Sequence, residues 1–360
     1  MKPPRLPPAP KILVVALRRF GDVLLTTPLI RSLRLAWPDA SIEALVFADT
    51  AGILEGNPDL SRLVTMPPRP SAAQSLSLAA RLWRRYDLAI STQCGDRPTF
   101  FGIVAGRRAI APVESTFNGR LKRALLHRSI PYQAGVHRVE KILQLADLLG
   151  IARAPEVVCP LLRAVAELPA GDYAVIHAAP MFRYKQWAKE GWRALAAKLG
   201  ERGLTVIATG GPAEAERHYL DEVWNGVPEL RRLDGRLDWP QLAGLLAKAR
   251  VHIGPDTSVT HLAAAAGCPT VALYGPTDPR LWGPWPAGGL DRVWEAAGRV
   301  QHRGSVWLVQ NPLPCVPCQL EGCERRIDSY SACLDELPAE FVIAVVEEVL
   351  HQSQHGVGLF

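Results

Sequence analysis

The stretch "GPDTSVTHLAAAAGCP" gathers several polar side chains where a buried strand is expected to end and a helix to begin. Asp256, Thr257 and Ser258 precede the expected helix, and His261 lies on its first turn. A helix start needs one such side chain as a cap, and its free backbone N–H groups can bind an anion. We therefore predict a phosphate or diphosphate site at this turn, with capping alone as the simpler alternative.

Two other loops that follow expected strands carry groups suited to phosphate and sugar. The loop "AAPMFRYKQW" contains Arg183 and Lys185, and cationic side chains of this kind hold phosphoryl oxygens. After the next expected strand, "GGPAEAER" offers glycines for close backbone approach, and either Glu214 or Glu216 could accept ribose hydroxyls. A solvated loop and ordinary acidic residues in a first helical turn are the simpler interpretations.

Asp22 follows the first apolar run, in "ALRRFGDVLL", at the expected start of a helix. An N-cap role would explain an aspartate at this position. The same carboxylate could instead act as a general base that takes a proton from a hydroxyl group. The residues alone leave both roles open.

Three aromatic or imidazole side chains have two interpretations each. His137 opens an amphipathic segment, where it is expected to cap the helix or lie on the surface. Trp282 and Trp285, in "LWGPWP", either line a pocket for a sugar or adenine or fill the core.

Four cysteines fall close together near the end of the chain. Their spacing could ligate zinc, although the later gaps match no common zinc-finger pattern. Free thiols or a redox-labile loop are the alternatives in a reducing compartment. A metal is therefore left open for this group, which consists of Cys315, Cys318, Cys323 and Cys333.

Apolar runs alternate with segments of helical period, which predicts an α/β fold with parallel sheets covered on both faces. Strands are expected at 11–17, 41–47, 87–92, 108–112, 173–179, 204–210 and 251–254, and helices at 23–36, 72–85, 188–199, after Pro212, at 239–249 and at 338–351. No regular alternation of apolar runs and helical segments is found over 281–335. A proline-broken connection at 152–171 separates two doubly wound, Rossmann-like domains, 1–165 and 166–360, expected to face a cleft.

Composition limits the partners. Lysine and arginine total 41 against 35 acidic residues, an excess too small for a dedicated nucleic-acid binder but suited to anionic small molecules or a negatively charged membrane surface. No apolar stretch is long enough for a membrane helix, and the start lacks the apolar segment of a secretion signal. We therefore expect a cytoplasmic protein.

Three segments together resemble a known family. They are "ILVVALRRFGDVLLTTPLIRSLRLAWPDASIEALV", "KQWAKEGWRALAAKL" and "GPDTSVTHLAAAAGCPTVALYGPTDP", in this order over most of residues 11–285. The chain resembles the heptosyltransferases of lipopolysaccharide core synthesis, glycosyltransferase family 9. The later "LWGPW" and the cysteine-rich segment are most similar to the heptosyltransferase III subgroup, which adds a branch heptose to the inner core.

This resemblance implies a GT-B fold, with the acceptor bound by the N-terminal domain and the donor by the C-terminal one. In this family the final helix often packs back on the N-terminal domain. It implies ADP-L-glycero-D-manno-heptose as donor, a lipid-anchored lipopolysaccharide core as acceptor, and inverting transfer that needs no metal or other cofactor. Because the acceptor is lipid-anchored, we expect peripheral contact of the N-terminal domain with the cytoplasmic face of the inner membrane.

The resemblance also assigns roles to residues. Asp22 matches the carboxylate taken as catalytic base, and Lys185 matches the lysine that contacts the donor diphosphate. Asp256, Thr257 and His261 match an Asp-Thr-Gly-x-x-His element at the nucleotide sugar. Ser258 replaces the glycine of that element, which implies a slightly different approach to the phosphates or heptose. Which of the two glutamates after Pro212 aligns with the family's ribose-binding glutamate stays open.

Other functions are compatible with these residues. An epimerase or a glycosyltransferase with another nucleotide-sugar donor would share the architecture, and a non-catalytic nucleotide-sugar-binding protein would tolerate loss of Asp22. A dinucleotide-dependent oxidoreductase is disfavoured because no Gly-x-Gly-x-x-Gly follows an expected strand.

Overall fold

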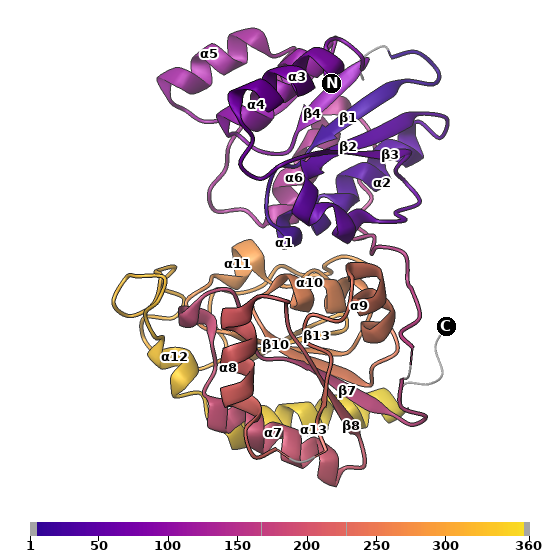
Figure 1. Ribbon diagram of the computed structural model, residues 1–360. Coiled ribbons are helices and arrows are strands. Elements are labelled where there is room, and N and C mark those ends of the chain that lie inside the picture. Colours follow the sequence, from indigo (N-terminus) through magenta and orange to yellow (C-terminus); the bar gives the residue numbers. More distant parts are fainter. Residues whose placement is uncertain (1–5, 167, 228, 356–360) are drawn as a thin grey trace. The chain divides into compact units, whose positions relative to one another are not determined.

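The computed structural model describes residues 6–166, 168–227 and 229–355. They form two compact units, unit 1 up to Leu161 and unit 2 from Leu162 onward. Figure 1 shows the elements of each unit. The division falls within the proline-broken connection that the sequence indicates.

Unit 1 alternates strands and helices. Its elements are β1 (Lys11–Val15), α1 (Phe20–Leu24), α2 (Thr27–Ala36), β2 (Ser41–Phe47), η1 (Ala48–Leu54), β3 (Arg62–Met66), α3 (Ala72–Leu82), β4 (Leu88–Ser91), α4 (Asp96–Ala105), β5 (Ala109–Val113), α5 (Phe117–Leu125), β6 (Arg128–Pro131) and α6 (Arg138–Leu149). The helix expected at 23–36 is two helices, because Pro28 lies in the first turn of α2, where its missing N–H costs nothing.

The unit 1 sheet is parallel, in the order β3-β2-β1-β4-β5-β6. Alternate residues of its strands point to opposite faces, so Ile12 and Val14 of β1 belong to one buried cluster with α2 and α6. Leu13 and Val15 belong to another cluster with α3 and α4. Burial on both faces is why the strands read as continuous apolar runs.

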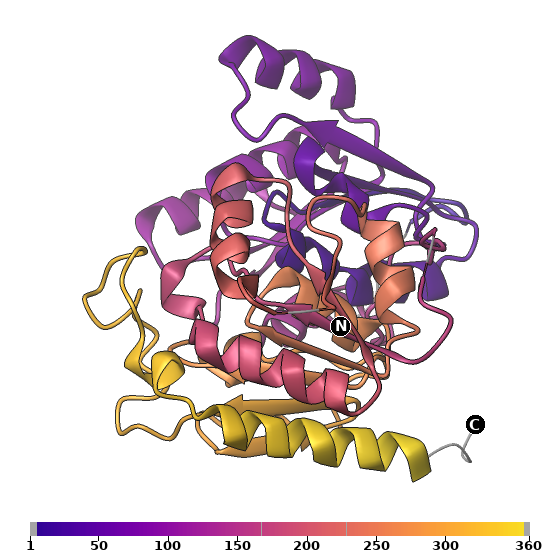
Figure 2. The ribbon, with the colours of Figure 1, turned by 60° about the horizontal axis from the view of Figure 1, so that its bottom comes forward.

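Unit 2 repeats this alternation. Its elements are β7 (Tyr173–His177), η2 (Arg183–Lys185), α7 (Lys189–Glu201), β8 (Thr205–Thr209), α8 (Glu214–Trp224), β9 (Arg231–Arg232), α9 (Trp239–Leu246), β10 (Val251–Pro255), α10 (Ser258–Ala265), β11 (Thr270–Tyr274), α11 (Pro279–Trp282), β12 (Val300–Arg303), β13 (Val306–Gln310), α12 (Ala332–Asp335) and α13 (Ala339–His355). Figure 2 shows α13 alongside α7, against which it packs.

The unit 2 sheet has the order β12-β13-β11-β10-β7-β8-β9, and only the pairing of β12 with β13 is antiparallel in the part of the chain described. The expectation that 281–335 holds no regular elements was wrong, because β13 pairs with β11 and extends the sheet. Tryptophan, proline and glycine surround β12 and β13, so these short strands do not stand out as apolar runs in the sequence. The prediction of two doubly wound, mostly parallel α/β sheets is confirmed.

Each sheet contains one point at which the strand order reverses. In unit 1 this point lies between β1 and β4, and in unit 2 between β7 and β10. The segments after the two central strands leave toward opposite faces there, which opens a crevice at the carboxyl ends of the strands where ligands bind. The polar loops singled out in the sequence follow β1, β7 and β10.

No helix among the described residues has both the length and the apolar character needed to cross a membrane.

Candidate active site

The loops after β7 and β10 bring two predicted residues into contact. Lys185 ends the short helix η2 after β7, and Asp256 follows β10. The Nζ atom of Lys185 lies 2.5 Å from Oδ2 of Asp256, with side chains that are 20% and 9% exposed. This ion pair, formed by residues far apart in the sequence, stands at the switch point of the unit 2 sheet.

Three more side chains surround the carboxylate of Asp256. Thr277 donates a hydrogen bond of 2.7 Å to Oδ2, and the Tyr274 hydroxyl donates one of 3.3 Å to Oδ1. Nε2 of His261 lies 3.8 Å from Oδ1. Burial by itself raises the pKa of Asp256, but the attraction of Lys185 and His261 and the hydrogen bonds outweigh it, so the pKa falls below its usual value. The carboxylate is therefore ionised at neutral pH.

Capping of α10 uses one residue of the polar cluster. Thr257 is the N-cap, and its hydroxyl accepts a hydrogen bond of 3.3 Å from the Thr260 N–H. Ser258 is the first residue of the helix, and Asp256 is committed to the lysine instead of to the cap. Capping alone thus leaves the ion pair and the serine unexplained, which favours a ligand at this helix start.

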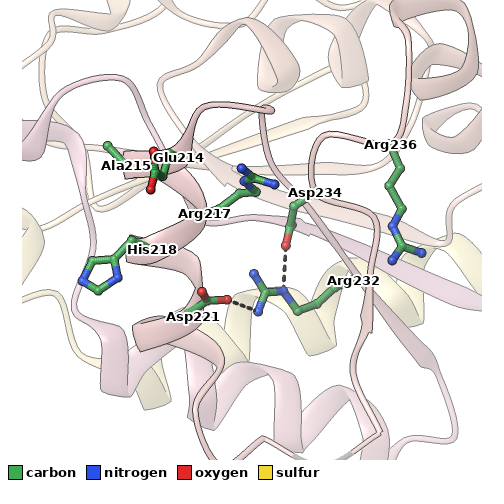
Figure 3. Close-up of a pocket in the computed structure, with 8 residues that line it drawn as sticks. All are labelled: Glu214, Ala215, Arg217, His218, Asp221, Arg232, Asp234 and Arg236. Atoms are coloured by element: carbon green, nitrogen blue, oxygen red, sulfur yellow. Dashed lines mark hydrogen bonds and ion pairs between the residues drawn. The ribbon is translucent and has the colours of Figure 1, made fainter.

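The two glutamates of α8 have different environments. The backbone N–H of Gly211 donates to Glu216 Oε1 over 2.5 Å, and burial raises the pKa of Glu216 despite this bond. Glu214 is exposed and lines a cavity of about 940 Å³. Figure 3 shows Glu214 and Arg217 extending from α8 and Arg232 from β9 around this cavity.

In unit 1, Asp22 lies in the first turn of α1 and does not cap it. The N-cap of α1 is Arg19, which makes no side-chain capping bond, so the capping interpretation of Asp22 was wrong. Oδ1 of Asp22 lies 3.2 Å from Nε of Arg138, and the side chains are 12% and 7% exposed. A nearly buried carboxylate and guanidinium thus meet at the first residue of α6.

Sequence reasoning missed Arg138. Its Nη1 donates to the Thr92 carbonyl over 3.2 Å, just after β4, so it links the segments that follow β1 and β4. Burial lowers the pKa of Arg138, and the charge of Asp22 acts against this shift. His137 before it is the N-cap of α6, and its Nδ1 accepts from the Val139 N–H, as one of the two interpretations predicted. An arginine at a helix start, where cations are disfavoured, was the available signal.

Other expected site residues lie elsewhere. Arg183 pairs with Asp335 of α12 over 3.4 Å, while Lys185 beside it turns to Asp256. Trp285 is 2% exposed and belongs to the core, whereas Trp282 is half-buried.

The four clustered cysteines are free thiols, of which Cys333 is buried. Burial raises the pKa of Cys333 to about 12, and the nearby Cys318, Cys315 and Cys323 add to the rise. Within residues 6–166, 168–227 and 229–355, no three or more histidine, cysteine, aspartate or glutamate side chains are placed to hold a metal ion.

Comparisons with known proteins show the family of this chain. Residues 76–289 match glycosyltransferase family 9 (heptosyltransferase). Lipopolysaccharide heptosyltransferase 3 of Escherichia coli is 26% identical over 95% of this chain and 100% of its own length. The protein of that name from strain K12 is 28% identical over 94% and 97%.

Among solved structures, E. coli heptosyltransferase WaaC with ADP superposes with a TM-score of 0.72 at 22% identity, covering 94% of this chain and 99% of that one. The resemblance seen in the sequence is confirmed, including the likeness to heptosyltransferase III, and the two α/β units are those of a GT-B fold. The family match covers more than half of the sequence, so this chain belongs to glycosyltransferase family 9, the heptosyltransferases.

Proposed function

We propose that this enzyme is an inverting glycosyltransferase that transfers heptose from ADP-L-glycero-D-manno-heptose to the inner core of lipopolysaccharide. The observation that carries the donor assignment is the meeting of Lys185, Asp256 and the start of α10 at the switch point of the unit 2 sheet. The names of the relatives, heptosyltransferases of lipopolysaccharide, favour heptose transfer over an epimerase or a non-catalytic sensor.

The donor would bind unit 2 through its diphosphate and ribose. The α10 backbone N–H groups and the Lys185 ammonium supply positive charge for the diphosphate. Asp256 holds Lys185 at the crevice, and Thr257 fixes the first turn of α10. Ser258 and His261 lie in that first turn and would contact the phosphates or the heptose. Glu214, exposed at the cavity, would accept the ribose hydroxyls, since Glu216 is engaged with Gly211.

The acceptor would bind unit 1, where Asp22 takes the proton from its hydroxyl group. The acceptor oxygen then forms a bond to the anomeric carbon as the bond from that carbon to the diphosphate breaks, and ADP leaves with the electron pair. A single in-line displacement inverts the anomeric centre. Arg138 would keep the Asp22 carboxylate in one orientation, because their charged groups lie 3.2 Å apart in a nearly buried setting.

The reaction as proposed requires no metal or other cofactor. Negative charge develops on the departing ADP, and Lys185 with the α10 dipole would stabilise it. With lipid-anchored lipopolysaccharide core as its acceptor, the enzyme would act in the cytoplasm at the inner membrane surface.

A test follows ADP release from ADP-heptose with a heptose-containing core acceptor, comparing wild type with Asp22→Asn and Lys185→Met. Calorimetry of ADP-heptose binding provides the control. Asp22→Asn should lower turnover by about 10²–10⁴ and keep donor affinity, whereas Lys185→Met should weaken donor binding. A wild type that binds ADP-heptose but releases no ADP with any core acceptor would refute the reaction, and one that binds no ADP-heptose would refute the donor assignment.

A further inference from the structure

Helix α5 of unit 1 packs against the described part of its unit through one side. It packs against β5, and Gly119 sits so close to Glu114 that an added Cβ would lie 1.9 Å from its carbonyl oxygen. Lys122 donates to the Cys94 carbonyl over 2.7 Å and pairs with Asp96. Gly119 and Lys122 therefore mark the side of α5 that faces the unit.

The opposite side of α5 presents large apolar side chains to solvent. Phe117, Leu121 and Leu125 are 74%, 59% and 62% exposed. Their spacing of four residues places them in one stripe along the helix. An amphipathic helix of a globular unit normally turns such a stripe inward, whereas α5 turns its glycine inward and its stripe outward. In Figure 1, α5 lies at the margin of unit 1.

Positive charge borders the stripe. Arg120 and Arg123 are exposed on the neighbouring helix positions, and the Arg120 guanidinium lies 5.7 Å from the centre of the Phe117 ring. Helix α5 itself contains no acidic residue. An apolar stripe flanked by arginines matches the interface of an anionic lipid bilayer, where the apolar groups enter the acyl boundary and the cations meet the headgroups.

We propose that α5 is the membrane-docking element of this enzyme and lies in the plane of an anionic bilayer with Phe117, Leu121 and Leu125 inserted. The proposal rests on the proposed function in one respect, because a lipid-anchored acceptor is what makes bilayer docking useful. It adds the surface, the orientation of the helix and the lipid charge that the enzyme requires.

Vesicle co-sedimentation of the full chain tests the proposal. Vesicles of phosphatidylcholine alone are compared with vesicles that also contain phosphatidylglycerol. Wild type should bind the anionic vesicles far more strongly, and added salt should weaken this binding. Leu121→Ser should weaken it about tenfold, as expected for loss of one inserted leucine. Arg120→Gln and Arg123→Gln should each weaken it about fivefold.

Leu35→Ser is the matched control. Leu35 is 66% exposed and lies in the last turn of α2 in unit 1, a helix that packs against α6. Its replacement should leave vesicle binding unchanged. Equal vesicle binding by Leu121→Ser and Leu35→Ser would overturn the proposal. So would a wild type that ignores anionic vesicles but self-associates through α5, seen in light scattering as a dimer that Leu121→Ser dissociates.

A second readout separates this proposal from the proposed function. With a delipidated, soluble core acceptor, Leu121→Ser should release ADP at the wild-type rate, whereas with acceptor embedded in anionic vesicles it should be slower by about the loss in vesicle binding. Absence of turnover in wild type with both acceptors would refute heptose transfer. The role of α5 in membrane docking would then be judged from vesicle binding alone. Equal slowing on the soluble acceptor would refute a docking role.

Discussion

Replacing Asp256 with asparagine removes one charge from the ion pair and keeps the shape of the side chain. The charges lie 2.5 Å apart, and at an effective dielectric constant of about 20 their attraction amounts to about 7 kcal/mol. Desolvation of the two ions offsets much of this, and asparagine can still accept from Thr277. We therefore expect the free energy of unfolding of unit 2 to fall by about 2–4 kcal/mol, and its Tm to fall by about 5–15 °C.

Calorimetric unfolding of wild type and Asp256→Asn, with and without ADP, measures this change. The pKa of Asp256 is lower in the folded chain than its usual value, so its contribution to stability is present above about pH 4 and disappears as pH falls through the folded pKa. The difference in Tm between the two proteins should therefore shrink below about pH 4.

Thr277→Val provides the control, because it removes a hydrogen bond to the same carboxylate and leaves the ion pair in place. It should lower stability by about 1 kcal/mol and keep the loss of stability at low pH, because Lys185 and His261 still lower the pKa of Asp256. A Tm for Asp256→Asn equal to that of wild type at neutral pH would refute the reasoning, because the pair would then make no net contribution.

Three other predictions concern Asp22, the two glutamates of α8 and two buried histidines of the unit 2 sheet. Asp22→Asn should lower kcat by about 10²–10⁴ as loss of a general base does, with donor affinity within about twofold by calorimetry; a kcat close to wild type would contradict that role. Glu214→Gln should raise the KM for ADP-heptose about threefold to tenfold through loss of a hydrogen bond of about 1 kcal/mol. Glu216→Gln should mainly lower Tm, because it weakens the hydrogen bond from Gly211. If steady-state kinetics and melting show the reverse, Glu216 is the ribose-binding residue and Glu214 the structural one. Burial lowers the pKa of His177, in β7, to about 4 and that of His252, in β10, to about 3, so both side chains are neutral in the folded chain above those values. In the unfolded chain they become protonated below about pH 6.5, so the free energy of unfolding falls as the pH decreases below that value. Urea unfolding between pH 6.5 and 4.5 should show a loss of about 1.4 kcal/mol per pH unit for each histidine, and His252→Gln should halve that slope.

The fold class was predictable because both sheets are buried on both faces. Strands such as β1 and β7 must then be continuous apolar runs, and the helices between them must carry helical period, so that alternation alone indicates two doubly wound units. The strands β12 and β13, at one end of the unit 2 sheet, were not predicted. They are short, and their neighbours supply tryptophan and proline in place of a regular pattern.

The candidate site was predictable in its members but not in its contacts. Lys185 and Asp256 stand out because polar residues after buried strands gather at one edge of a parallel sheet. The ion pair between them depends on β7 and β10 being neighbours, which no local pattern specifies. The same is true of the contact between Arg138 and Asp22, because the position of Arg138 at the start of α6 does not indicate its partner.

The sequence by itself indicated most residues of the candidate site, because each lies in a local strand, turn and helix signal and in motifs shared with glycosyltransferase family 9. Only the tertiary structure decided their states. It paired Lys185 with Asp256 and Asp22 with Arg138, gave the cap of α10 to Thr257, and turned the apolar stripe of α5 outward. These outcomes follow from strand order and burial, which arise from contacts between residues far apart in the chain and therefore leave no signal in any local stretch of it.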